Sequence, residues 1–262
     1  MLIQADAKAL EWWTAVWLSQ DPVGLEEIHK GIDLHTENQK AFGLPSRLIA
    51  KKYLFRTIYR GSSYAFSKDP EFMTTSSSIK FWDGIGEKFF SKYAGLNATH
   101  SRWAQQVVQG KPIVGPQGRE WFFEMKRNYR GDLEVPWTTL TNHPVQGTGH
   151  DIMAIIRVSF FNRLKKQNLQ ARLIGTIHDS ILVDTPEENV DAVVGLFESC
   201  FEDMPDNFNR MFGVRPNIPL KCECSVGHTM NSSVEYYSEY LRSEEHTSEL
   251  QSHSFISYAV FC

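Results

Sequence analysis

Several classes of protein are excluded by what this 262-residue chain lacks. No apolar run approaches the ~18 residues that a membrane-spanning helix needs. The chain does not open with a charged region followed by an apolar stretch, as a secretory signal would. Four cysteines are too few for a disulfide scaffold of this length and indicate a reducing compartment. We therefore expect a cytoplasmic protein with no membrane partner.

Metal-binding cysteine patterns and a strong charge imbalance are also missing. Cys222 and Cys224 lie two residues apart with no second pair elsewhere, so a structural zinc site is not expected. The net charge of −4 gives no hint of a nucleic-acid partner. With 42% hydrophobic and 13% aromatic residues, the chain has enough apolar side chains for a packed core, which excludes disorder.

Both ends of the chain differ from what an intact domain would present. Residues 242–262 resemble the one-frame translation of a sequencing-library adapter, with Ser254-Phe255 in the place of an index. We expect this tail to be an artefact and disordered; the alternative is a short apolar C-terminal anchor. Met1 directly precedes an apolar strand, which indicates a truncated reading frame or one piece of a split protein.

Hydrophobic periodicity predicts a mixture of strands and helices. Helices are predicted at 10–19, 33–42, 46–59, 89–93, 97–110, 144–166 and 187–201. Strands are predicted at 2–6 and 219–226, and hairpins at 113–123 and 171–184, the second with its turn at 178–180. Because the strands and helices do not alternate strictly, the predicted fold class is α+β.

A basic helix is the clearest local concentration of charge. From Pro45 to Lys68 there are six Lys or Arg residues and no acidic one, and Ser46 is a candidate N-cap. One face carries residues spaced by four: Arg47, Lys51, Phe55 and Tyr59. Beside it runs a second stripe of Lys52, Arg56 and Arg60, and the inward side holds Leu48, Tyr53, Leu54 and Ile58. Two cations followed by two aromatics suit a triphosphate and a base or sugar; the alternative is a solvated basic face with two core aromatics.

Two carboxylates are expected in apolar strand surroundings. Asp6 ends the first strand, and Asp179 lies in the hairpin centre between Ile177 and Ile181. A carboxylate there needs a partner, and a divalent cation is a natural one. Carboxylates from separate strands can hold two Mg²⁺ ions about 3.5–4 Å apart for in-line phosphoryl transfer. The alternative is that each is a turn or salt-bridge residue.

A polar segment, Asn142–Thr148, is predicted to open the long helix, with Pro144 near its first turn. Asn142 and Gln146 are four residues apart, so they share a helix face and can hydrogen-bond base edges or sugars. The alternative is that Asn142 only caps the helix.

Taken in chain order, these residues resemble the motifs of family A DNA polymerases, the bacterial DNA polymerase I type. Asp6–Glu11 resembles motif A, the series from Arg47 to Tyr59 resembles motif B, and His178-Asp179 resembles motif C. Asn142–Thr148 and Asp33-Leu34-His35 resemble two further family segments, and the resemblance extends from residue 2 to about residue 240. The order Tyr59-Arg60-Gly61, with one extra residue before the glycine, resembles phage-type members. Ser180 stands where the family has a glutamate.

The resemblance implies a role for each matching residue. The ligands of two Mg²⁺ ions would be Asp6, the Ala7 carbonyl and Asp179. The incoming dNTP would contact Glu11, His35, Arg47, Lys51, Phe55 and Tyr59, where Glu11 is the steric gate against a ribose 2′-OH. The catalytic residues would be Asp6, Asp179 and Lys51, the last as proton donor to the leaving pyrophosphate. Primer–template DNA would contact Asn142, Gln146 and His178. Phenylalanine at position 55 implies poor acceptance of dideoxynucleotides.

The implied fold is a polymerase right hand: a palm of antiparallel sheet and helices, mostly helical fingers, and no thumb. The palm would take residues 1–35 and 136–241, and the fingers 36–135. The implied activity is template-directed DNA synthesis in replication or repair, in the cytoplasm of a bacterium or phage-infected host. An upstream thumb and exonuclease region, or a separate subunit, would be a further partner, and the fragment without a thumb is expected to lose processivity or activity.

Two alternatives remain open. A single-subunit RNA polymerase has similar motifs, but Glu11 argues against it because an RNA polymerase must admit the 2′-OH. The other alternative is a non-catalytic nucleic-acid-binding remnant.

Overall fold

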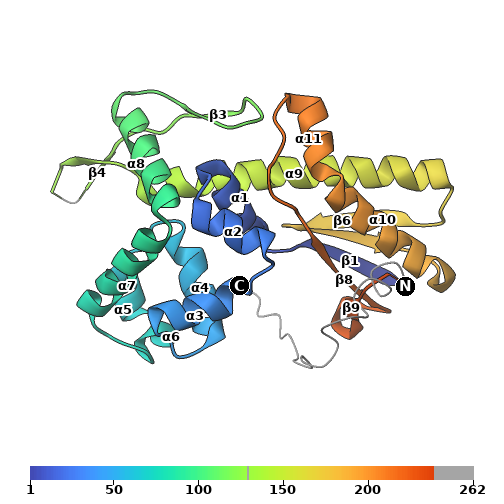
Figure 1. Cartoon of the computed structure of the whole chain (residues 1–262), viewed down its shortest axis with the longest axis horizontal. Coiled ribbons are helices and arrows are strands. Elements are labelled where there is room, and N and C mark those ends of the chain that lie inside the picture. The colour runs from blue at the N-terminus through green and yellow to red at the C-terminus, as the bar shows by residue number, and fades with distance from the viewer. Residues whose placement is uncertain (129, 239–262) are drawn as a thin grey trace. The chain divides into compact units, whose positions relative to one another are not determined.

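The computed structural model describes residues 1–128 and 130–238, which form two compact units (Figure 1). The sheet unit contains residues 1–6, 157–201 and the described residues from 222 onward. The helical unit contains Ala7–Ile156 and Glu202–Lys221. Helices and antiparallel strands mix without alternation, which confirms the α+β class. The predicted tail at 242–262 lies outside the described residues. Within them, no helix is both long and apolar enough to cross a bilayer.

The sheet unit is built on five strands in the order β6-β7-β1-β8-β9. The strands are β1 (Leu2–Ala7), β6 (Arg172–Ile177), β7 (Ser180–Asp184), β8 (Cys222–Gly227) and β9 (Val234–Tyr236). β1 lies between β7 and β8, and its alternate residues Ile3 and Ala5 are fully buried because they share the face of the strand that packs against the core. The predicted first strand and the 171–184 hairpin are confirmed, whereas the predicted strand at 219–226 begins only at Cys222.

The helical part of the sheet unit comes from two helices and two short 3₁₀ turns. α10 (Val190–Glu202) follows η1 (Glu187–Asn189), and η2 (Met230–Ser232) precedes β9. The C-terminal part of α9 (Trp137–Gln167) faces α10, because the rings of Phe160 and Phe197 stack in parallel with centroids 3.8 Å apart. Both rings are fully buried, so this pair anchors the two helices to each other.

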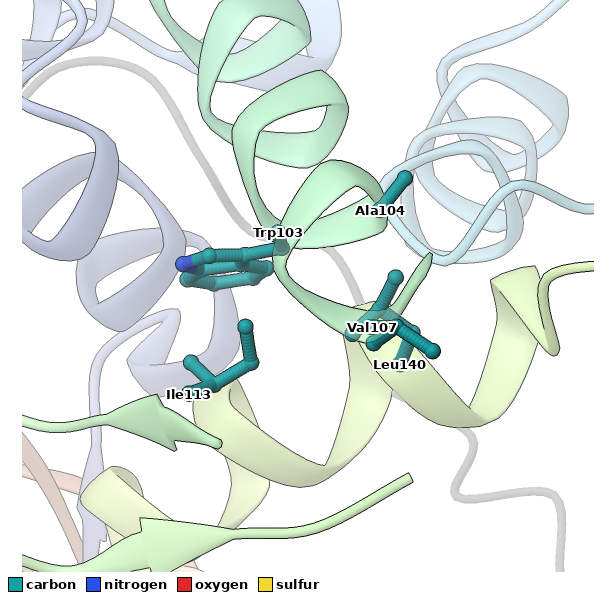
Figure 2. Close-up of a cluster of buried hydrophobic side chains, with 5 residues drawn as sticks. All are labelled: Trp103, Ala104, Val107, Ile113 and Leu140. Atoms are coloured by element: carbon teal, nitrogen blue, oxygen red, sulfur yellow. The ribbon is translucent and has the colours of Figure 1, made fainter. Parts of the chain in front are cut away.

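The long helix α9 starts about two turns earlier than predicted. The prediction placed Pro144 in the first turn and Asn142 at the entrance, but both lie inside the helix. Proline removes its own N–H, whose partner would be the carbonyl of Leu140, and its ring crowds that carbonyl, so tertiary packing has to offset the cost. Leu140 is fully buried in the cluster of Figure 2, together with Trp103, Ala104, Val107 and Ile113. This packing keeps the preceding two turns helical.

The helical unit contains α1 (Leu10–Ser19), α2 (Pro22–His29), α3 (Leu34–Phe42), α4 (Arg47–Thr57), α5 (Ser63–Lys68), α6 (Pro70–Met73), α7 (Ile79–Lys92), α8 (Ala94–Val108) and α11 (Met204–Phe212). The helices α1, α3 and α8 confirm their predictions to within a few residues. Four helices, α2, α5, α6 and α11, were not predicted, and each of them is only four to nine residues long.

Two short hairpins complete the helical unit. One, within the predicted hairpin at 113–123, joins β2 (Ile113–Val114) to β3 (Glu120–Trp121), and the other joins β4 (Lys126–Arg127) to β5 (Leu133–Glu134). Gln117 and Arg119 of the first hairpin bind Asp151 of α9: Gln117 Nε2 donates at 3.0 Å, and the Arg119 Nη2 and Nε donate at 2.7 and 3.0 Å. These contacts attach the hairpin to the long helix.

An aromatic core supports α4. Tyr53 of α4 stacks on Trp82 of α7 with ring centroids 5.7 Å apart, and Phe66 and Phe72 pack on the same indole. Tyr53, Leu54 and Ile58 are buried as predicted for the inward side of this helix. The prediction was wrong for Leu48, which is 56% exposed: it lies on the side of the helix that carries Lys52, whereas Ile49 and Ala50 of the same turn are buried.

Candidate functional site

In the sheet unit, two predicted carboxylates lie at the same end of neighbouring strands. Asp6 of β1 pairs in register with Ser180 of β7, and Asp179 is the residue immediately before Ser180. Paired residues of antiparallel strands have Cα atoms about 4.5–5.5 Å apart. The register therefore brings the carboxyl groups of Asp6 and Asp179 to one edge of the sheet, although 172 positions separate them in the chain.

The turn that carries Asp179 is short and well defined. Ile177 pairs with Ser180, which leaves His178 and Asp179 as a two-residue hairpin turn. His178 adopts a left-handed conformation with φ of 52°, which histidine tolerates better than most residues. The Ser180 hydroxyl donates to the Ile177 carbonyl at 3.0 Å and accepts from Gln4 Nε2 at 3.3 Å. The serine at the family's glutamate position therefore stabilises the turn.

The donor set fits a divalent cation that also takes oxygen ligands from its substrate. Two carboxylates and a backbone carbonyl are hard oxygen donors, and Mg²⁺ is commonly held by one or two carboxylates plus phosphates. Among the described residues, no three His, Cys, Asp or Glu side chains gather as a complete metal cage. Asp184 lies at the opposite end of β7, in register with Leu2, so it cannot replace the missing glutamate.

In the helical unit, α4 carries the predicted basic face. The Ser46 hydroxyl accepts from the Ile49 N–H at 3.2 Å, which confirms it as the N-cap. Arg47, Lys51 and Phe55 lie on successive turns of one face. Tyr59 was predicted on the same helix, but α4 ends at Thr57 and Tyr59 lies in the following turn.

That turn ends the helix through an unusual residue. Arg60 has a positive φ of 58°, a conformation in which glycine is usual. Its guanidinium donates to Asn97 Oδ1 at 2.6 Å and to His100 Nδ1 at 3.1 Å, and it lies 3.8 Å from the ring centroid of Phe90. These contacts hold the turn despite its strained backbone, and the turn positions Tyr59.

The two basic stripes of α4 have different surroundings. In the second stripe, Lys52 pairs with Glu71 at 2.5 Å and Arg56 with Asp69 at 2.6 Å, so these cations have structural partners. In the first stripe, Arg47 pairs with Asp33 at 2.8 Å, whereas Lys51 is exposed and forms no ion pair with any residue in the described part of the chain. Lys51 is therefore the cation of this helix that is most open to an anionic ligand.

His35 of α3 lies beside this first stripe. Its ring centroid is 5.9 Å from that of Phe55. Burial, together with the nearby charges of Arg47 and Lys51, lowers the pKa of His35 to about 4, and Asp33 opposes that shift. The imidazole is therefore neutral at neutral pH, and its buried Nδ1 has no hydrogen-bond partner among the described residues. Three predicted triphosphate residues thus lie in one electropositive neighbourhood.

A second group joins the predicted steric gate to two other predicted residues. Gln146 Nε2 donates to a carboxylate oxygen of Glu11 and, at 3.0 Å, to the Tyr59 hydroxyl. Burial, and then the negative charge of Glu11, raise the pKa of Tyr59 above its usual range. Asn142 lies one turn before Gln146 on α9, so the predicted shared face is present. Sequence spacing placed these residues in three separate motifs and gave no sign of their contact.

The chain is similar to DNA polymerases from bacteria and from a phage. A family model described as DNA polymerase family A matches residues 1–232. The DNA polymerase I of Borreliella burgdorferi is 25% identical, over 87% of this chain and 24% of that protein. The thermostable DNA polymerase I of Thermus aquaticus is 25% identical, over 90% and 27%. The DNA polymerase of Bacillus phage SP01 is 23% identical, over 94% and 27%. This chain spans about a quarter of the length of these relatives.

One solved structure shares the fold. The POL domain of Pol1 from M. smegmatis, in complex with DNA primer-template and dNTP, superposes with a TM-score of 0.72 at 19% sequence identity. The similarity covers 88% of this chain and 40% of that one.

Proposed function

This chain belongs to DNA polymerase family A, and from that premise we propose that it contains the palm and fingers of a template-directed DNA polymerase. Residues 1–35 and 136–241 are assigned to the palm and 36–135 to the fingers. The reaction is attack of a primer 3′-OH on the α-phosphate of a dNTP. The observation that carries the proposal is the register that sets Asp6 beside the Asp179 turn. The similar M. smegmatis structure contains primer–template DNA and a dNTP, which supports the same ligands here.

The carboxylates of Asp6 and Asp179, with the Ala7 carbonyl, are proposed to hold two Mg²⁺ ions. Such ions activate the attacking hydroxyl and neutralise the charge that develops on the leaving phosphates. The protein itself contributes a rigid backbone around the two carboxylates. β1 is a central strand, and the hydrogen bonds of Ser180 stabilise the turn, so the carboxylates need little reorganisation when the ligands bind.

The first basic stripe of α4 is proposed to bind the triphosphate. Arg47 and Lys51 supply positive charge, and His35 supplies a neutral imidazole beside them. Lys51 is also proposed as the proton donor to pyrophosphate, and its solvent exposure leaves it accessible for that role. Phe55, one turn further along, would stack near the sugar and base of the nucleotide.

The group of Glu11, Tyr59 and Gln146 is proposed to control which nucleotide enters. Glu11 would exclude a ribose 2′-OH, and its contact with Gln146 restricts the movement of its side chain. Tyr59 would lie beside the template base. Asn142 and Gln146 on α9 and His178 at the hairpin turn would contact the primer–template. Base pairing, and not side-chain readout, then selects the nucleotide.

The proposal is tested by replacing, one at a time, the carboxylate in the turn before β7 and the carboxylate at the far end of β7. The full chain is supplied with primer–template DNA, Mg²⁺ and dNTPs, and extension and DNA binding are both measured. Asp179→Ala is expected to lower extension at least about 100-fold with DNA binding changed less than about threefold. The matched control, Asp184→Ala, removes an exposed carboxylate at the far end of β7 and should extend primers like the parent.

Two outcomes would count against the proposal. Equal extension by Asp179→Ala and the parent would refute the metal assignment. Primer–template binding without any Mg²⁺-dependent incorporation, by the protein with an upstream thumb region restored, would favour a non-catalytic remnant.

A further inference from the structure

One carboxylate in the helical unit contacts two elements of the proposed triphosphate site. Asp33 is the N-cap of α3: its Oδ1 accepts from the N–H groups of His35 and Thr36 at 3.1 and 3.4 Å, and its Oδ2 accepts from the Thr36 hydroxyl at 2.7 Å. Asp33 therefore sets the start of the helix turn that carries His35.

The same carboxylate binds Arg47 at the start of α4. The Arg47 Nε donates to Oδ2 at 2.8 Å and Nη2 donates to Oδ1 at 3.1 Å, which is a two-point contact along one edge of the guanidinium. Arginine has five N–H donors in a planar fork, and this contact uses two of them. One N–H of Nη2 and one of Nη1 remain side by side along the end of the fork, and the second N–H of Nη1 points back toward the side chain. That end is a free edge with the geometry that binds phosphate oxygens.

The pair is better suited to orientation than to stability. The Arg47 and Asp33 side chains are 56% and 47% exposed, and exposed ion pairs contribute little to folding free energy. The carboxylate itself, however, is immobilised by the helix cap. Burial of the carboxyl opposes the shift, but hydrogen bonds from Arg47 and Thr36 hold the pKa of Asp33 well below its usual range, so it is ionised at neutral pH. An immobile, charged partner fixes the direction of the arginine fork.

We propose that Asp33 is a positioning residue that aims the free edge of Arg47 at the triphosphate of the incoming nucleotide. The inference rests on the proposed nucleotide site and adds to it a residue that contacts no substrate atom. It links α3 to α4, so that His35 and Arg47 are positioned by one side chain.

A negative charge beside Arg47 can also weaken nucleotide binding. If Asp33 competed with the triphosphate for Arg47, or repelled the triphosphate, removal of the negative charge would tighten nucleotide binding. If Asp33 orients Arg47, the same removal weakens binding, because the fork then samples many directions. The direction of the change in nucleotide affinity therefore distinguishes positioning from competition.

Asp33→Asn is the informative variant. The amide keeps one oxygen for the helix cap, but its nitrogen cannot accept a hydrogen bond from Arg47. We expect the dNTP KM in primer extension, and the dNTP Kd by calorimetry, to rise about tenfold, with kcat changed less than about twofold. Glu37→Gln is the matched control, because it removes one negative charge from the same helix at a residue that pairs with Lys40, 3.1 Å away. Its KM should stay within about twofold of the parent.

A double-mutant cycle separates positioning from general damage. In an Arg47→Ala background, Asp33→Asn should change KM and Kd less than about twofold, because there is no fork left to orient. A tenfold effect that persists without Arg47 would overturn the inference, as would unchanged or tighter dNTP binding in the single variant. If the parent incorporates and binds dNTPs, these results bear on Asp33 alone. If the parent does neither, the proposed function fails, and this inference fails with it.

Discussion

A buried carboxylate that caps two helices provides the sharpest test of how the helical unit is held together. Asp21 is fully buried. Its Oδ1 accepts from the N–H groups of Val23 and Gly24 at 3.1 and 2.9 Å, at the start of α2. Its Oδ2 accepts from the N–H groups of Gly95 and Leu96 at 2.7 and 3.1 Å, at the start of α8. One side chain thus satisfies four helix-end donors.

The close approach of these segments depends on a glycine. A Cβ at Gly95 would lie 2.8 Å from the Asp21 Cα, so a larger residue would push the start of α8 away from the carboxylate. Glycine at this position is therefore required by space, and it allows the 2.7 Å hydrogen bond.

Asp21→Ala removes both caps at once. An N-cap is worth about 1 kcal/mol, and each buried N–H left without an acceptor costs about 1–3 kcal/mol. Water reaching the cavity recovers part of that loss, so we expect a decrease of about 4 kcal/mol in the free energy of unfolding. The matched control is Ser78→Ala, which removes an exposed cap with one acceptor contact, to the Phe81 N–H at 3.3 Å, and should cost about 1 kcal/mol or less.

Equilibrium unfolding of the full chain in urea measures both variants. Native-state hydrogen exchange adds a local readout, because the amides of Gly24, Gly95 and Leu96 should lose protection in Asp21→Ala before the rest of the unit. A loss of stability in Asp21→Ala no greater than that in Ser78→Ala would refute the argument that this carboxylate joins the two helices.

Two further predictions concern the proposed nucleotide site. The negative charge of a bound triphosphate should raise the pKa of His35 from about 4. Binding of a dNTP should therefore take up protons near pH 5, and the affinity should fall as the pH rises towards 7. Calorimetry in buffers of different ionisation enthalpy measures the proton uptake, and equal heats in all buffers would contradict it. Phe55→Tyr should increase dideoxynucleotide termination at least about tenfold, the value of one added hydrogen bond; an unchanged termination ladder would refute the role given to Phe55.

Local patterns predicted most of the elements near the site. The periodicity of the helices predicted at 10–19 and 33–42 and the cap at Ser46 are signals carried by a few neighbouring residues, and each has its expected place. The prediction was wrong for the start of α9, because Asn142 and Pro144 are residue types typical of a helix N-terminus. The buried contact of Leu140 with α8 outweighs that local signal, and no residue near Leu140 reveals it.

The sequence by itself determined the chemistry available to this protein: the strand-end carboxylates, the four-residue spacing of Arg47, Lys51 and Phe55, and the order of the motifs. Only the tertiary structure decided which of these residues contact one another. The register of β1 and β7 sets Asp6 beside Asp179, and Asp33 binds Arg47 in place of any other cation. Periodicity and capping are properties of adjacent residues, whereas pairing across long chain separations depends on strand register and core packing. No local sequence pattern encodes strand register or core packing.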